Sequence, residues 1–188
     1  MKFSQPLKSW LEFCSIVSSV GYVRGESPGF LYDYEMLTVT HYEQTKQSAC
    51  GAYVLKMILE YWGIQENLDV LIEKIGVKIN VGASHAALIK VLRAYKLSVS
   101  AQSNASVHDL EKYLSKSMPV IINYISPLSG LGHYSIVIGI EDGHVFLCDS
   151  SNGPRYSLDI EEFDRIWFNS NKLSKHWLAA PYPMHISK

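Results

Sequence analysis

The most hydrophobic stretch of the sequence lies at residues 49–62, where nearly every side chain is apolar. Its two charged positions, Lys56 and Glu60, are four residues apart and would share one narrow polar face of an α-helix. A helix with so little polar surface is predicted to lie at the centre of the core. Ser48 is placed to cap its start, and Gly63 is placed to end it in a left-handed conformation.

Several other segments of the first half carry periodic apolar residues. Apolar side chains at helical spacing predict helices near 68–75, 84–96 and 106–117, with Ser84 and Ser106 as N-caps. The sequence LSVSAQ at 97–102 predicts a strand, and so does the tyrosine-rich segment 32–40. A short amphipathic helix is predicted near 7–20.

The hydrophobic period changes after residue 118. Short runs of β-branched and aromatic residues predict strands at 119–125, 133–140, 144–149 and 175–183, with a further helix at 159–168. The sequence EDGH at 141–144 predicts the tight turn of a hairpin. A helical first half followed by an antiparallel sheet in the second half predicts an α+β domain.

Size and charge narrow the class of protein. A chain of 188 residues can bury one full hydrophobic core. Its 17 basic and 18 acidic residues nearly balance, so the sequence gives no sign of the excess positive charge that nucleic-acid binding requires. No segment reaches the roughly 18 apolar residues of a membrane span. We expect one soluble domain at 41–188, preceded by an N-terminal extension at 1–40. The sequence leaves the oligomeric state open.

The cysteines favour a reducing compartment. Cys14, Cys50 and Cys148 form neither an even disulfide framework nor a CxxC pair. The N-terminal apolar run is interrupted by Glu12 and serines, and no convincing cleavage site follows, so we do not expect a signal peptide. The expected location is cytoplasmic; later export without a signal peptide stays open.

Cys50 falls in the first turn of the central helix. Unpaired backbone N–H groups and the helix dipole favour an anion there, so its thiol should ionise more easily than a free cysteine. The alternative is a small buried hydrophobic residue, which is what most free cysteines are. The helix alone does not decide between them.

Two residues of the second half could activate a thiol. His133 starts a strand after a glycine-rich turn, and Asp149 ends the next strand, so a hairpin about EDGH would bring them to one open end. A carboxylate could then orient the imidazole beside a thiolate. The alternatives are a surface histidine and an aspartate that starts a turn.

A side-chain amide could complete the site. Gln44 lies six residues before Cys50 and could donate to an oxyanion together with the Cys50 backbone N–H. Gln47 is the rival candidate, and a solvated loop glutamine is the alternative for either.

These residues occur in the order Gln, Cys, His, Asp, and the chain resembles the papain-like cysteine peptidases of family 39, the bacteriocin-processing or double-glycine leader peptidases. The matching motifs are QTKQSACG at 44–51, GHY at 132–134 and DSSNG at 149–153, and the similarity covers roughly 40–170. Ser150 stands where the family often has proline, and Ala49 where an acidic or small polar residue is common.

The resemblance implies a papain-like fold and a thiol peptidase that needs no cofactor or metal. It implies Cys50 as nucleophile, His133 as general base and acid, Asp149 as its orienting group and Gln44 as oxyanion donor. The implied substrate is a peptide or protein, with small residues such as glycine before the scissile bond. We expect a bacterial, free-standing domain, because the sequence has no transmembrane helix and no phosphate loop of an export ATPase.

Other functions share these residues. The same residues could serve a secreted or injected effector that acts as a protease, deamidase or acyltransferase on a partner protein. The fold could also bind peptides without cleaving them. The remaining histidines show no metal-ligand spacing and are expected to be solvated or locally hydrogen-bonded. Cys148 should face the core, on the opposite side of its strand from Asp149.

Overall fold

The computed structural model describes residues 35–77, 81–168 and 175–184. The helices there are α2 (Cys50–Tyr61), α3 (Leu68–Ile75), α4 (His85–Ala94), α5 (Val107–Leu114) and α6 (Ile160–Ile166). The strands are β1 (Leu97–Gln102), β2 (Val120–Ile125), β3 (Gly132–Glu141), β4 (His144–Asp149), β5 (Gly153–Asp159) and β6 (Leu178–Pro183). None of the helices in these ranges has the length and hydrophobicity needed to cross a bilayer.

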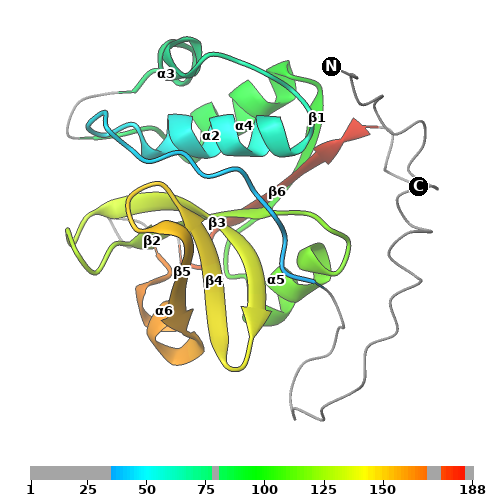
Figure 1. Ribbon diagram of the computed structural model, residues 1–188, viewed down its shortest axis with the longest axis vertical. Helices are drawn as coiled ribbons and strands as arrows, with labels where there is room; N and C mark the ends of the chain where they lie inside the picture. Colours follow the sequence, from blue (N-terminus) through cyan, green and yellow to red (C-terminus); the bar gives the residue numbers. More distant parts are fainter. Residues whose placement is uncertain (1–34, 78–80, 169–174, 185–188) are drawn as a thin grey trace, which may run out of the picture.

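One antiparallel sheet separates two layers of helices (Figure 1). Its strand order is β1-β6-β2-β3-β4-β5, so the last strand lies inside the sheet, between β1 and β2. Side chains alternate along β2 between two cores: Ile121 packs with α2, α3 and α4, whereas Val120 and Ile122 pack with α5 and α6. The sheet is therefore buried on both faces, and the α+β architecture agrees with the sequence-based prediction.

The central helix α2 was predicted correctly in extent but not in its N-cap. Ala49 occupies the cap position without a side-chain hydrogen bond, while Ser48 has a left-handed φ of 58°. The prediction of a Ser48 cap is wrong because the cap position falls one residue later, and the left-handed backbone of Ser48 is not the extended conformation typical of an N-cap. The C-terminal prediction is confirmed: Gly63 has φ 77°, its amide donates to the Glu60 carbonyl, and the Ile64 amide donates to the Leu59 carbonyl.

Most other local predictions are confirmed. The helix over 68–75 and the strands over 97–102 and 144–149 match to the residue. Ser84 caps α4 by accepting from the Ala87 amide, and Ser106 forms a capping box with Asp109 at α5. These elements are specified by side chains within one turn of their ends.

Two predictions about strands are wrong. Residues 35–40 form no strand; they run extended beside β3 and donate one backbone hydrogen bond, from the Leu37 amide to the Ile138 carbonyl, 2.8 Å. Strand β5 was not predicted, because Pro154 and exposed polar residues obscure its pattern on the sheet edge. The helix predicted near 7–20 lies outside the described residues.

Candidate active site

Cys50 is the first residue of α2 and is 8% exposed. The next residue, Gly51, lies in a confined space: a Cβ added there would lie 3.2 Å from Ile75 Cδ1 in α3, which is tight, and 3.5 Å from Tyr134 Cδ2 in β3, which is an ordinary contact. The start of the helix therefore packs closely against α3 and strand β3. This packing brings the thiol beside the beginning of β3, where His133 lies.

The thiol of Cys50 is poised to ionise. Burial is the largest single influence and raises its pKa, but the hydrogen bond and charge of His133 act in the opposite direction. Backbone hydrogen bonds at Tyr134 and Gly51 favour the thiolate as well. The net effect is a pKa below the ordinary value for cysteine.

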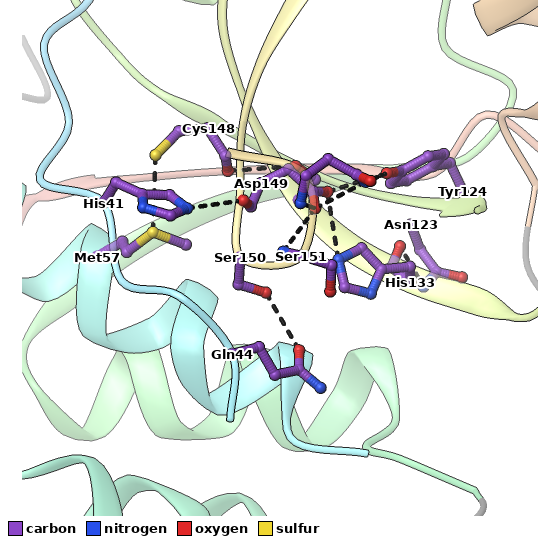
Figure 2. A network of polar contacts seen from close by, with 12 residues as sticks. His41, Gln44, Met57, Asn123, Tyr124, His133, Cys148, Asp149, Ser150 and Ser151 are labelled. Carbon is purple, nitrogen blue, oxygen red and sulfur yellow. Dashed lines mark hydrogen bonds and ion pairs between the residues drawn. The ribbon is translucent and has the colours of Figure 1, made fainter. Parts of the chain in front are cut away.

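His133 is the second residue of β3 and is largely buried. Its Nε2 lies 3.2 Å from Oδ2 of Asp149, in the geometry of an ion pair rather than of a regular hydrogen bond (Figure 2). Nδ1 is therefore the ring nitrogen available to the thiol. Burial lowers the pKa of His133, but its contacts with Asp149 and Cys50 outweigh burial and raise the pKa to about 10.

Asp149 ends β4 and is fully buried. Its Oδ1 accepts hydrogen bonds from the backbone amides of Ser151, 2.9 Å, and Asn152, 3.0 Å, and from the Asn152 side chain, 3.0 Å. The hydroxyl of Tyr124 donates to Oδ2, 2.9 Å. Burial raises the pKa of Asp149, but His133, the Ser151 amide and the Ser135 hydroxyl outweigh burial and lower the pKa to about 2. The carboxylate is therefore held ionised although it is fully buried.

The β3–β4 hairpin brings the two residues together. Asp142 and Gly143 both have positive φ, as a tight hairpin turn requires. A register shift between Val137 and Gly139 follows, after which Ile136 pairs with Cys148. Continued by one residue, this register puts Asp149 beside the face of β3 that carries His133. Cys148 faces the other core, fully buried, as predicted.

Gln44 lies against the turn that follows Asp149. Its backbone amide donates to the Ser150 carbonyl, 2.6 Å, and its side-chain Oε1 accepts from the Ser150 hydroxyl, 3.2 Å (Figure 2). Its Nε2 donates to the Lys46 carbonyl, 3.0 Å. The rival Gln47 is exposed, whereas Gln44 is half-buried. The contacts recorded for the Gln44 amide are with this turn and its own loop rather than with Cys50.

A cavity of about 500 Å³ opens beside the thiol. Besides Cys50, its lining residues are mostly small or aromatic: Val81, Gly82, Ala83, Ser84, His85, Ala86, Asn123, Gly132 and Tyr134. Among the described residues, the segment 82–86 contributes mainly small side chains to this lining.

Three histidines differ from the sequence-based expectation of solvated or locally bonded rings. His85 lines the cavity and stacks on Trp177 with centroids 3.8 Å apart, and burial lowers its pKa to about 4. His41 bonds through Nε2 to the backbone carbonyl of Asp149, 2.9 Å, far away in sequence. His176 is buried and stacks on Trp167. For His85 and His41 the local sequence carries no signal, because Trp177 and Asp149 come from distant segments.

The titratable groups of the site suit nucleophilic chemistry. Within the described ranges, no group of three or more His, Cys, Asp and Glu side chains is arranged to hold a metal ion. What the site brings together is a thiol of lowered pKa, a histidine of raised pKa and an ionised carboxylate. Such a set can attack a carbonyl carbon and return a proton to the leaving group.

Comparison with known proteins agrees with this geometry. In solved structures, the chain resembles a double glycine motif protease from an AMS/PCAT transporter in complex with the leader peptide, at 20% identity and a TM-score of 0.62, over 81% of this chain and 97% of that one. It also resembles the peptidase domain of Streptococcus ComA, at 16% identity and 0.62, over 81% and 100%. A putative C39-like peptidase from Bacillus anthracis gives 17% and 0.64, over 80% and 98%. At these identities the likeness shows the fold.

No curated protein sequence matches the chain. The model of the peptidase C39 family, however, matches residues 38–173, which include Gln44, Cys50, His133 and Asp149. This match covers well over half of the sequence. The chain therefore belongs to the peptidase C39 family.

Proposed function

We propose that this protein is a cysteine peptidase that cleaves peptide bonds through a thioester acyl-enzyme. The proposal depends on two successive contacts. The Cys50 thiol interacts with the His133 imidazole, and His133 Nε2 lies 3.2 Å from Oδ2 of Asp149. The lowered pKa of the thiol and the raised pKa of the imidazole favour a thiolate–imidazolium pair at neutral pH.

In the acylation step, the Cys50 thiolate attacks the carbonyl carbon of the scissile bond. The electron pair of the C=O bond moves to oxygen, and the Cys50 backbone N–H and Gln44 Nε2 donate to this oxyanion. When the intermediate collapses, the C–N bond breaks and His133 gives its proton to the departing amine. A thioester remains on Cys50.

Deacylation reverses these roles. Neutral His133 removes a proton from water, which attacks the thioester carbonyl. The C–S bond breaks, the product leaves as a carboxylic acid, and the thiolate–imidazolium pair is restored. Asp149 keeps the imidazole in one orientation throughout, because its own carboxylate is fixed by four protein hydrogen bonds.

We propose a substrate with small residues before the scissile bond. The small side chains of Gly82, Ala83 and Ala86 in the cavity lining support this. A structural neighbour is described as a double glycine motif protease bound to a leader peptide. A peptide ending in Gly-Gly before the cleaved bond is therefore the first substrate to test.

The test uses acetylated peptides that end in Gly-Gly joined to a fluorogenic amine. We expect release of the amine by the intact protein, and an acyl adduct on Cys50 after acid quenching in intact-mass spectra. The control is Cys50→Ala, which should retain its fold and lose both signals. Equal amine release by Cys50→Ala would overturn the proposal.

The products also separate peptidase from related chemistry. Hydrolysis yields a peptide carboxylate, whereas an acyltransferase yields a new amide when an amine is added. A deamidase releases ammonia from glutamine side chains and leaves the chain uncut. Only the first outcome supports the proposed function.

A further inference from the structure

One short turn, residues 149–152, contacts both sides of the proposed site. Asp149 faces His133, while Ser150 faces Gln44. The turn is itself fixed, because the amides of Ser151 and Asn152 donate to the Asp149 carboxylate. One short backbone segment therefore holds both side chains: the Asp149 carboxylate beside His133 and the Ser150 hydroxyl beside Gln44.

The hydrogen bonds fix which way the Gln44 amide points. The carbonyl of Lys46 can only accept, so the amide atom that meets it at 3.0 Å must be Nε2. Oε1 then faces Ser150, whose hydroxyl must act as the donor at 3.2 Å. One proton of Nε2 is used by Lys46, and the second remains available to another acceptor.

Ser150 is suited to hold this amide because it is completely buried. A buried hydroxyl needs a partner, and its recorded partner is Oε1 of Gln44. The backbone of the same residue accepts the Gln44 amide N–H, 2.6 Å. Ser150 thus forms hydrogen bonds with both the main chain and the side chain of Gln44.

We infer that Ser150 is a positioning residue, whose hydroxyl holds the Gln44 amide in the orientation that presents Nε2 to the oxyanion. This inference rests on the proposed function, in which Gln44 is the oxyanion donor. Ser150 is not among the residues that line the cavity beside the thiol, so its effect is exerted through Gln44. Figure 2 shows the Gln44 amide directed toward Ser150, below the imidazole of His133 in that view.

The orientation can be tested without turnover, by NMR of the Gln44 side-chain NH₂ group in ¹⁵N-labelled protein. Its signal is assigned by its disappearance in Gln44→Ala. We expect a rigid amide in the intact protein and in Ser157→Ala, which removes an exposed hydroxyl on β5. In Ser150→Ala the order parameter should fall and the two protons should exchange faster. An equally rigid amide in Ser150→Ala would overturn the inference, whether or not the protein cleaves peptides.

A kinetic cycle tests the consequence. Loss of one hydrogen bond predicts that kcat falls about three- to tenfold in Ser150→Ala with little change in KM. In a Gln44→Ala background the same substitution should change kcat less than about twofold, because the amide that it positions is gone. Equal losses in both backgrounds would show that Ser150 acts elsewhere, and would overturn the inference while leaving the peptidase proposal standing.

Alkylation of Cys50 separates failure of the inference from failure of the proposed function. Iodoacetamide carries its own leaving group and needs the thiolate rather than an oxyanion donor. Ser150→Ala should therefore alkylate as fast as the intact protein. If the intact protein alkylates slowly and cleaves no peptide, the proposed function fails, and the NMR result still decides whether Ser150 orients Gln44.

Discussion

The hydroxyl of Tyr124 donates to Oδ2 of Asp149, the same carboxylate oxygen that lies 3.2 Å from Nε2 of His133. The Asn152 side chain extends this contact, because its Nδ2 donates both to the Tyr124 oxygen, 3.3 Å, and to Oδ1 of Asp149, 3.0 Å. The carboxylate beside the imidazole is thus itself held by a network of hydrogen bonds. Each of its parts can be removed separately.

Tyr124→Phe tests that network by removing one oxygen atom. The free energy of unfolding should fall by about 1.5–3 kcal/mol, because a hydrogen bond to a buried charged group is lost. Urea denaturation measures the change. Tyr113→Phe is the matched control: its hydroxyl bonds the neutral Ser100 side chain, 2.7 Å, so a smaller loss of about 0.5–1.5 kcal/mol is expected. A larger loss in the control would contradict this account.

His133→Ala should make the Cys50 thiol harder to ionise. In the intact protein, His133 offsets the effect of burial and lowers the pKa of the thiol, so alkylation should have its pH midpoint below the unperturbed cysteine pKa of about 8.5. Without the imidazole only burial and the backbone remain, and the pH midpoint of alkylation should rise. Mass mapping of the Cys50 peptide follows the reaction separately from the other thiols. An unchanged pH midpoint in His133→Ala would contradict the activation of Cys50 by His133.

The pH dependence of kcat/KM should be bell-shaped. The acid limb reports ionisation of Cys50, whose pKa lies below its ordinary value. The alkaline limb reports loss of the imidazolium proton that the leaving amine needs, and His133 places it near pH 10. Peptide cleavage measured from pH 4 to 11 checks both limbs. An alkaline limb near pH 6.5 would mean that Asp149 and Cys50 do not stabilise the charged ring.

Asp149→Asn should shift the alkaline limb and leave the acid limb less affected. The carboxylate raises the pKa of His133, so its replacement by a neutral amide should move that limb to lower pH. We also expect kcat to fall by about 10²-fold or more, because the imidazole loses its charged orienting partner. A fall in kcat with an unmoved limb would assign Asp149 a purely structural role.

Ala83→Leu tests the cavity as the peptide site. Ala83 lines it beside Cys50, so a leucine there should occupy space that the peptide needs. We expect kcat/KM for Gly-Gly peptides to fall about tenfold or more. Alkylation by the much smaller iodoacetamide should continue, which shows that the fold and the thiol are intact. Unchanged peptide cleavage would place the substrate elsewhere.

Sequence reasoning succeeded where the deciding contacts are local. Ser84, Ser106 and Gly63 act within one turn of their helix ends, and the Asp142–Gly143 turn sets its own hairpin. The order of the Gln, Cys, His and Asp motifs indicated the family, because each motif is short and the number of residues between motifs can be counted in the sequence.

The rest depended on distant partners. Ser48 is a residue type that often caps helices, but its backbone is left-handed and the cap position falls on Ala49. His85 joins the cavity wall because Trp177, from the other end of the chain, stacks on it. Ser150 meets Gln44 across 106 residues of sequence. Such contacts between residues far apart in the sequence leave no pattern in either local segment.

The position of β6 between β1 and β2 determines when the sheet around this site can be completed during synthesis. Strands β1 and β2 do not pair with each other; β6 lies between them and pairs with both. During synthesis, β1 and the β2–β5 meander leave the ribosome before the strand that joins them. Trp177, which backs the cavity through His85, arrives with that same segment. A nascent chain can therefore carry Cys50, His133 and Asp149 and still have an unfinished cleft, so binding of peptide must wait for nearly the whole domain.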